Sequence, residues 1–478
     1  MKFKWMISAA LAGVLLGTIG GVSGGAAFGE VEWAEVTAAL GKLQQAPSGD
    51  LTRQQLDNLT KIGEALFVAK FTALDGAGRP AATQAIDPTK VRHQLTEPLA
   101  RISGPDSLAC GSCHNDPAPG GAGGFVTNVF ASEGFTNANF DTSDPQFSNE
   151  RGTNHLFGAG LIELLAREMS ADLAAARAKA LRLARQQGEP ERVALESKGV
   201  SFGFLTALPD GLVDLSEVDG VDTDLVIRPF SQKGVMTSLR QFTINAMNHH
   251  HGMQATERFG SRWTGENDFD EDKHVDELTP GDISALVAWQ ATLPAPTVWQ
   301  PDSDAWKQAA AKGAGLFNDW TCNSCHRTSL PLNSLKFSDP GPFDAAGTLD
   351  TSQVETTARY DLALFDWAKN LPKDDEGRVL VPLFGDLKRH KMTDRRIATL
   401  GNELLSQRFV GRDVFMTAEL WGVGSTAPYG HRNDFTTLDS IILAHGGAGR
   451  AARDAYEAAP APDRSALIAY LRTLVIEK

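Results

Sequence analysis

The chain has 478 residues, of which 42% are hydrophobic and 22% charged, so its composition is that of a globular protein rather than a disordered or fibrous one. At about 100–200 residues per domain, this length leaves room for two or three domains. The net charge of −14 at pH 7 argues against nucleic acid as a partner, because a duplex-binding surface needs basic side chains that displace counterions.

The N-terminus has the order of a secretory signal. Lys2 and Lys4 precede an apolar run over residues 5–19, and small residues follow up to Ala27. The run is shorter than the roughly 20 residues of a membrane span. We predict a signal peptide over residues 1–27 and a periplasmic location. The alternative is an uncleaved N-terminal segment, which would be this chain's attachment to a membrane.

Helical patterns dominate the rest of the chain. Apolar residues recur near helical spacing over residues 52–71 and 463–476, and Thr279-Pro280 has the order of a helix start. Strand-like runs are few and short. The predicted fold is therefore mainly α, with few short strands.

All four cysteines belong to two Cys-x-x-Cys-His pentads, which are Cys110, Cys113 and His114, and Cys322, Cys325 and His326. This pentad is the attachment signature of c-type haem, in which two thioethers hold the porphyrin and the histidine ligates the iron. A thioredoxin-like redox pair, a zinc site and a disulfide are the alternatives. A redox pair does not need the histidine in both copies, and structural zinc wants four clustered ligands. We predict two covalently bound haem c groups, with His114 and His326 as proximal ligands.

The two pentads lie within an internal repeat. Residues 63–67 (GEALF) precede the first pentad, and residues 313–317 (GAGLF) precede the second. Residues 153–160 (TNHLFGAG) follow the first pentad, and residues 417–424 (TAELWGVG) follow the second. The same order in both halves indicates duplication of one unit.

A proline-containing segment, residues 293–297 (LPAPT), lies between the halves. We therefore predict a tandem duplication of two c-type cytochrome domains. The N-terminal haem domain, with insertions, would cover residues 28–298, and the C-terminal haem domain would cover residues 299–478.

Three of the residues that follow the first pentad, His155, Glu163 and Glu168, are candidates for acid–base catalysis. A reactive haem needs such a group beside an open position on its iron. His155 could be a distal ligand, a proton donor or a buried histidine with ordinary hydrogen bonds. Glu163 and Glu168 follow it, although a carboxylate on a helix is more often simply solvated. The run His249-His250-His251 resembles a metal cluster, but adjacent helical residues point about 100° apart and cannot converge on one ion.

Three longer segments resemble the bacterial di-haem oxidoreductases related to di-haem cytochrome c peroxidases, a family often labelled as peroxidases or thiol oxidoreductases. These segments are residues 151–163, 228–252 and 420–447, and the resemblance extends over roughly residues 52–474. The thiol label receives no support here, because haem attachment uses every cysteine. The relatives hold calcium between their domains, but no acidic loop of this chain was identified as an EF-hand, so calcium is implied by the resemblance alone.

In the peroxidase relatives, an Ala-Pro-Tyr-x-His element is followed at fixed spacing by the methionine that ligates the second haem. The same offset from His431 falls on His445 in this chain. The resemblance thus implies that His326 and His445 are the axial ligands of the second haem. The alternatives are a local turn at His445, with Met392 or Met416 as the ligand. A second histidine gives a lower potential than methionine, and hence a poorer acceptor from a high-potential donor.

The resemblance implies a peroxidase-like oxidoreductase in which the second haem passes electrons and the first reacts with peroxide or oxygen. Its partners would be a redox protein, as donor or acceptor, and the small oxidant. Two alternatives stay open, a non-enzymatic electron carrier and an oxygenase acting on an apolar substrate, as in the rubber-cleaving relatives. The sixth position of the first haem, and an apolar channel reaching it, would distinguish them.

Overall fold

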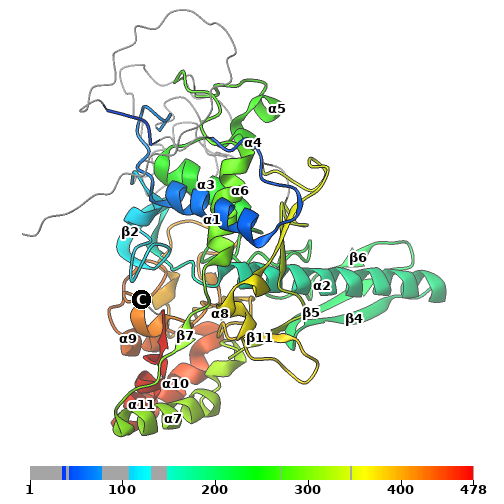
Figure 1. Ribbon diagram of the computed structural model, residues 1–478. Helices are drawn as coiled ribbons and strands as arrows, with labels where there is room; N and C mark the ends of the chain where they lie inside the picture. Colours follow the sequence, from blue (N-terminus) through cyan, green and yellow to red (C-terminus); the bar gives the residue numbers. More distant parts are fainter. Residues whose placement is uncertain are drawn as a thin grey trace, which may run out of the picture. The chain divides into compact units, whose positions relative to one another are not determined.

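A computed structural model describes residues 35–38, 42–77, 107–130, 148–270, 272–344 and 347–476 (Figure 1). The predicted signal peptide, residues 1–27, lies outside these ranges. Within them, no helix combines the length and the apolar character that crossing a bilayer requires.

The three helices predicted from the sequence are present as α1, α6 and α11. Thr52 and Thr279 each close a capping box at the start of α1 and α6, which satisfies backbone N–H groups of the first turn. The α-helices of the described residues are α1 (Arg53–Val68), α2 (Ala159–Gln187), α3 (Leu239–His251), α4 (Thr256–Phe259), α5 (Ser261–Thr264), α6 (Pro280–Thr292), α7 (Asp304–Asp319), α8 (Asp366–Lys369), α9 (Leu438–Leu443), α10 (Arg450–Ala458) and α11 (Ala461–Leu471).

Strands are more numerous than predicted. The prediction of a mainly α chain built of two c-type cytochrome domains is wrong, because the chain is 37% helical and 17% strand, with many small sheets. The described strands are β1 (Gly49–Asp50), β2 (Gly123–Phe130), β3 (Ser148–Thr153), β4 (Glu191–Ser197), β5 (Val200–Ala207), β6 (Val213–Asp214), β7 (Thr297–Val298), β8 (Leu330–Leu332), β9 (Lys336–Asp339), β10 (Ala358–Asp361), β11 (Val379–Val381), β12 (Arg389–Lys391), β13 (Val414–Met416) and β14 (Leu474–Val475). They pair as β1-β10-β9, β4-β5-β6, β2-β3, β8-β11, β12-β13 and β7-β14.

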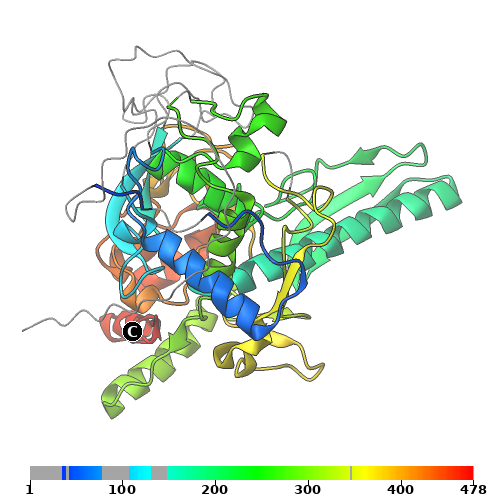
Figure 2. The same ribbon diagram turned by 45° about the horizontal axis from the view of Figure 1, so that its top comes forward.

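The longest helix, α2, packs against the β4-β5-β6 sheet (Figures 1 and 2). In β5, Val200, Phe202 and Leu205 are buried while Ser201 and Phe204 are exposed, and a bulge in the pairing with β4 shifts this alternation between Ser201 and Phe204. The β4-β5 hairpin turns at Lys198 and Gly199, which both have positive φ, as a two-residue hairpin turn requires. This alternation was available in the sequence and was missed.

The repeated glycine-containing segments, residues 63–67 and 313–317, each lie in a helix that crosses another helix closely. α1 packs on α6, and α7 packs on α11. A methyl group at Gly63 would clash with the backbone carbonyl of Ala285, and one at Gly313 would clash with that of Ala466. Residues 37–478 nevertheless form one compact unit by their contacts, and the domain boundary at residue 298 stays a prediction.

Candidate functional site

Both Cys-x-x-Cys-His pentads fold in the same way. Each begins as a 3₁₀ turn, Cys110–Ser112 and Cys322–Ser324. In each, the backbone N–H of the histidine donates to the carbonyl of the first cysteine at 3.0 Å. This winding brings the first cysteine and the histidine to one side of the turn, as covalent attachment and ligation of one haem require.

Both pentads open onto one cavity of about 530 Å³, a volume in the range of cofactor sites. Its walls come from α3, α9 and the segments around residues 151–157 and 415–431. The predicted haem residues on its wall are Cys110, Cys113, His114, Cys322, Cys325, His326 and His445. The two predicted sites therefore share one cavity.

In the second site, the rings of His326 and His445 meet edge to face, with centroids 6.5 Å apart and planes inclined by 60°. The Nδ1 atoms lie 3.3 Å from the carbonyl of Phe384 and 2.8 Å from that of Ile441, respectively. A carbonyl only accepts, so each Nδ1 carries the proton and each Nε2 is left as a metal donor. Burial lowers the pKa of His326, to about 4, and that of His445, which keeps both rings neutral.

The spacing of this pair fits an iron between the rings. Two metal–nitrogen bonds of about 2 Å, plus roughly 1 Å from each nitrogen to its ring centre, give about 6 Å between centroids. Met392 and Met416 also line the cavity, but His445 is the candidate whose side chain is paired with His326 in the described structure. The residues present therefore fit a haem with two histidine ligands.

In the first site, His114 lies beside Phe67, with ring centroids 6.1 Å apart, and Phe67 lies 4.2 Å from Trp289. Burial lowers the pKa of His114 to about 4, and its Nδ1 is buried without a hydrogen-bond partner. The charges of the nearby His250 and His155 also lower the pKa of His114, so both side chains adjoin the first site.

Of the three consecutive histidines at the end of α3, His251 approaches the first pentad. Its Nε2 lies 3.2 Å from Cys110 Sγ, and its Nδ1 donates to the carbonyl of Ser107 at 2.7 Å. The ring centroids of neighbouring histidines are 6.2 and 6.4 Å apart. As predicted from helix geometry, the three rings do not gather around one point.

His155 belongs to the first copy of the repeat and lines the cavity, where it contacts Trp421 of the second copy. Its Nε2 donates to the carbonyl of Trp421 at 3.0 Å, and its buried Nδ1 has no hydrogen-bond partner. Burial lowers the pKa of His155 to about 4, so the ring is neutral near pH 7. His155 is therefore a proton acceptor at Nδ1 rather than a donor.

Glu163 and Glu168 do not line this cavity. Glu163 is 1% exposed, pairs with Arg167 and accepts the backbone N–H of Leu239 at the start of α3 at 2.7 Å. Burial raises the pKa of Glu163 to about 7, against the opposing effect of Arg167. Glu168 binds Lys198 at 2.6 Å and accepts backbone N–H groups of the loop before β9.

We expect the Glu163→Gln variant to lose stability without a change at the two predicted haem sites. The amide leaves the guanidinium of Arg167 without its buried counter-ion, which costs about 1–3 kcal/mol. Thermal unfolding followed by circular dichroism, beside absorption spectra and turnover with peroxide, checks this. Glu217→Gln, which breaks an exposed pair with Arg192, is the control and should change stability much less. Lost turnover at unchanged stability would instead support a catalytic Glu163.

Glu419 is a cavity residue that the sequence reasoning missed. Its Oε1 is buried without a hydrogen-bond partner, and burial, with the nearby Asp386, raises its pKa to about 7. Glu419 occupies the position in the second copy of the repeat that His155 occupies in the first. The repeat itself was thus the signal that could have found it.

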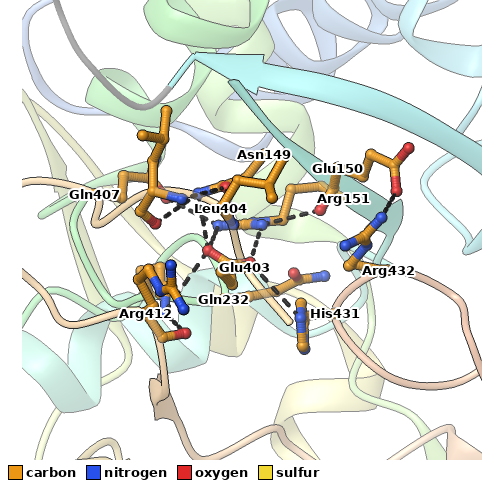
Figure 3. A network of polar contacts seen from close by, with 12 residues as sticks. Asn149, Glu150, Arg151, Gln232, Glu403, Leu404, Gln407, Arg412, His431 and Arg432 are labelled. Atoms are coloured by element: carbon orange, nitrogen blue, oxygen red, sulfur yellow. Dashed lines mark hydrogen bonds and ion pairs between the residues drawn. The ribbon is translucent and has the colours of Figure 1, made fainter. Parts of the chain in front are cut away.

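A buried charged network adjoins another part of the cavity wall, which two of its members, Arg151 and His431, line (Figure 3). Arg151 binds both carboxylate oxygens of Glu403. Lys233 Nζ and His431 Nε2 each lie 3.7 Å from that carboxylate, and Lys233 donates to three backbone carbonyls. We call Arg151, Lys233, Glu403 and His431 the Glu403 cluster.

Two further groups of side chains have metal-ligand chemistry. Cys325, Asp386 and His390 offer ligand atoms within 4.8 Å of one another, which is the zinc alternative at the second pentad. Haem attachment would convert Cys325 Sγ to a thioether, so a haem at the second pentad and a zinc ion bound by Cys325 exclude each other. The carboxylates of Asp268, Asp270 and Asp272 also gather within 4.8 Å. This alternation of aspartates was overlooked in the sequence, and carboxylates alone do not establish calcium binding.

No family model matches the chain, and no curated protein matches it. Among solved structures, it is similar to hydrazine synthase of Kuenenia stuttgartiensis, determined under xenon pressure, with a TM-score of 0.38 and 12% sequence identity. The match covers 93% of this chain and 98% of that chain. A likeness at this TM-score carries no argument about fold or function.

Proposed function

We propose that this chain is a periplasmic di-haem c-type oxidoreductase, similar to the di-haem cytochrome c peroxidases. The second haem would transfer electrons, and the first would react with peroxide or oxygen. The observation that carries the proposal is the His326–His445 pair beside the second pentad, in a cavity shared with the first. Electrons would be exchanged with a redox protein, and the net charge of −14 suits a basic one.

Haem iron would supply the one-electron chemistry. The chain's own residues suggest different tasks for the two sites. His326 and His445 would together hold the iron of the second haem, which suits electron transfer, and His114 would hold the iron of the first, where a small oxidant would react. His155 accepts a proton at Nδ1, and Glu419, with its pKa of about 7, holds or releases one near neutral pH.

A second candidate is an oxygenase acting on an apolar substrate. The feature that favours it is the apolar part of the cavity wall near α3, where Phe230, Met236 and Phe242 lie. Such a wall suits an apolar substrate next to the first haem, whereas a peroxidase needs room only for a small oxidant.

The electron paramagnetic resonance spectrum of the fully oxidised protein tests the proposal. We expect one low-spin ferric signal, from a haem with two histidine ligands, and one axial high-spin signal, from an open haem. Peroxide should change the high-spin signal first. Oxygen uptake with an added apolar alkene separates the oxygenase from the peroxidase.

Two low-spin signals that persist after reduction and reoxidation would contradict the enzyme proposal and support the electron carrier. A protein without covalent haem, purified from a host that matures c-type cytochromes, would contradict both and favour zinc or a disulfide at the pentads.

A further inference from the structure

The Glu403 cluster holds more positive than negative charge. The side chains of Lys233 and Glu403 are 0% exposed, and that of Arg151 is 8% exposed. Burial and the neighbouring cations lower the pKa of His431 to about 3, so this ring is neutral. Two cations therefore face one carboxylate.

Among the residues that the structure describes, the nearby charges do not remove this excess. Arg432 is paired with Glu150, and Asp413, the other carboxylate near Lys233, is paired with Lys391 at 3.4 Å. An uncompensated buried cation is costly, because the protein interior replaces little of its hydration. The excess charge therefore favours an anion at this wall.

The cluster also faces the cavity with an unsatisfied polar atom. Arg151, His431, Gln232 and Gln407 line the cavity, and the buried His431 Nε2 has no hydrogen-bond partner. Buried polar atoms are nearly always hydrogen-bonded in folded proteins, so an acceptor in the cavity would satisfy an N–H group at His431 Nε2. The guanidinium of Arg151 already binds both oxygens of Glu403, so it would attract a second carboxylate through its positive charge rather than through a free pair of N–H groups.

We propose that the Glu403 cluster binds a carboxylate of the group that fills the cavity. This inference rests on the proposed function, under which the carboxylate is a haem propionate. A propionate stays in place as long as the haem is attached, and so it compensates a charge that is buried permanently. A carboxylate on an anionic substrate has the same chemistry and is the other source.

Two variants of the haem-loaded protein test the inference through reduction potentials. Arg151→Gln removes a positive charge, so the potential of one haem should fall, because the more negative site favours ferric iron. Glu403→Gln removes a negative charge, so the potential of the same haem should rise. Resonance Raman spectra should show the propionate bending band of that haem shifted in both variants. Arg192→Gln, which breaks an exposed ion pair, is the matched control and should change neither measurement.

Titration of acetate into the wild type separates the two sources of carboxylate. If a haem propionate occupies the site, Arg151→Gln and Glu403→Gln should shift the reduction potential in opposite directions in the absence of acetate. Added acetate should then give no saturable response. If the site binds a carboxylate from solution, acetate should shift the reduction potential in a saturable way. Arg151→Gln should abolish this response, and Arg151→Lys should restore it. If both variants shift the potentials in the same direction or not at all, and acetate has no effect, the carboxylate site is disproved.

A misfolded Arg151→Gln protein leaves Glu403→Gln and the acetate titration as independent tests. Protein without covalent haem would overturn the proposed function. The acetate titration, followed by calorimetry, would still decide whether the Glu403 cluster binds a carboxylate.

Discussion

Replacing His445 by methionine should raise the reduction potential of the second haem by on the order of 100 mV, part of the roughly 0.8 V range that axial ligands cover. A thioether donates less electron density to ferric iron than an imidazole does, and it therefore favours the ferrous state. The rings of His326 and His445 are in position for this exchange, since each has its Nδ1 bound to a backbone carbonyl. Spectroelectrochemical titration of the His445→Met protein measures the shift.

His274→Met is the control, because His274 lies outside the cavity and its replacement should leave both potentials unchanged. His445→Ala should convert the second haem to a high-spin form that binds added imidazole. If both His445 variants keep the low-spin spectrum and potential of the wild type, another residue is the ligand, and Met392 and Met416 would be tested next.

Gly313→Ala should destabilise the protein by about 1–3 kcal/mol, the cost of overpacking a tight contact. A methyl group at Gly313 would meet the backbone carbonyl of Ala466, so α7 and α11 would have to separate. These helices adjoin the second pentad, and we expect its absorption spectrum to become heterogeneous as well. Thermal unfolding of the haem-loaded protein checks the first expectation, and absorption spectra check the second.

Gly315→Ala provides the matched control two residues along the same helix. A methyl group there would have no atom within 4 Å. Alanine is a better helix former than glycine by roughly 0.5–1 kcal/mol, so this variant should be slightly more stable than the wild type. Equal destabilisation by the two substitutions would rule out the close helix crossing as the cause.

The sequence predicted those parts of the fold that have a long periodic signal. α1, α6 and α11 were identified from apolar spacing and helix-start residues, and each is present. Most strands were missed because two to four residues, such as β7 or β12, are too short to show alternation. The pairing of β7 with β14 depends on contacts between distant segments, which no local pattern records.

For the candidate site, the two Cys-x-x-Cys-His pentads were visible in the sequence because the signature of c-type haem attachment has a fixed spacing. His445 was identified through the family resemblance, and its ring contact with His326 became visible only in the three-dimensional structure. Glu163 was chosen as an acidic residue after the pentad, but its partners, Arg167 and the N-terminus of α3, were not evident from the sequence. The Glu403 cluster joins segments far apart along the chain, so its charge balance was likewise not visible.

The helix crossing beside each pentad also sets an order for assembly. α1 and α7 precede their pentads, whereas their partners α6 and α11 come from much later segments. In an exported chain, each pentad would emerge before the helix that completes its surroundings, and haem-attaching enzymes could reach its cysteines during that interval. For the second pentad the interval would last until α11 has been translocated, so the proposed haem attachment there would compete with a late step of folding rather than with an early one.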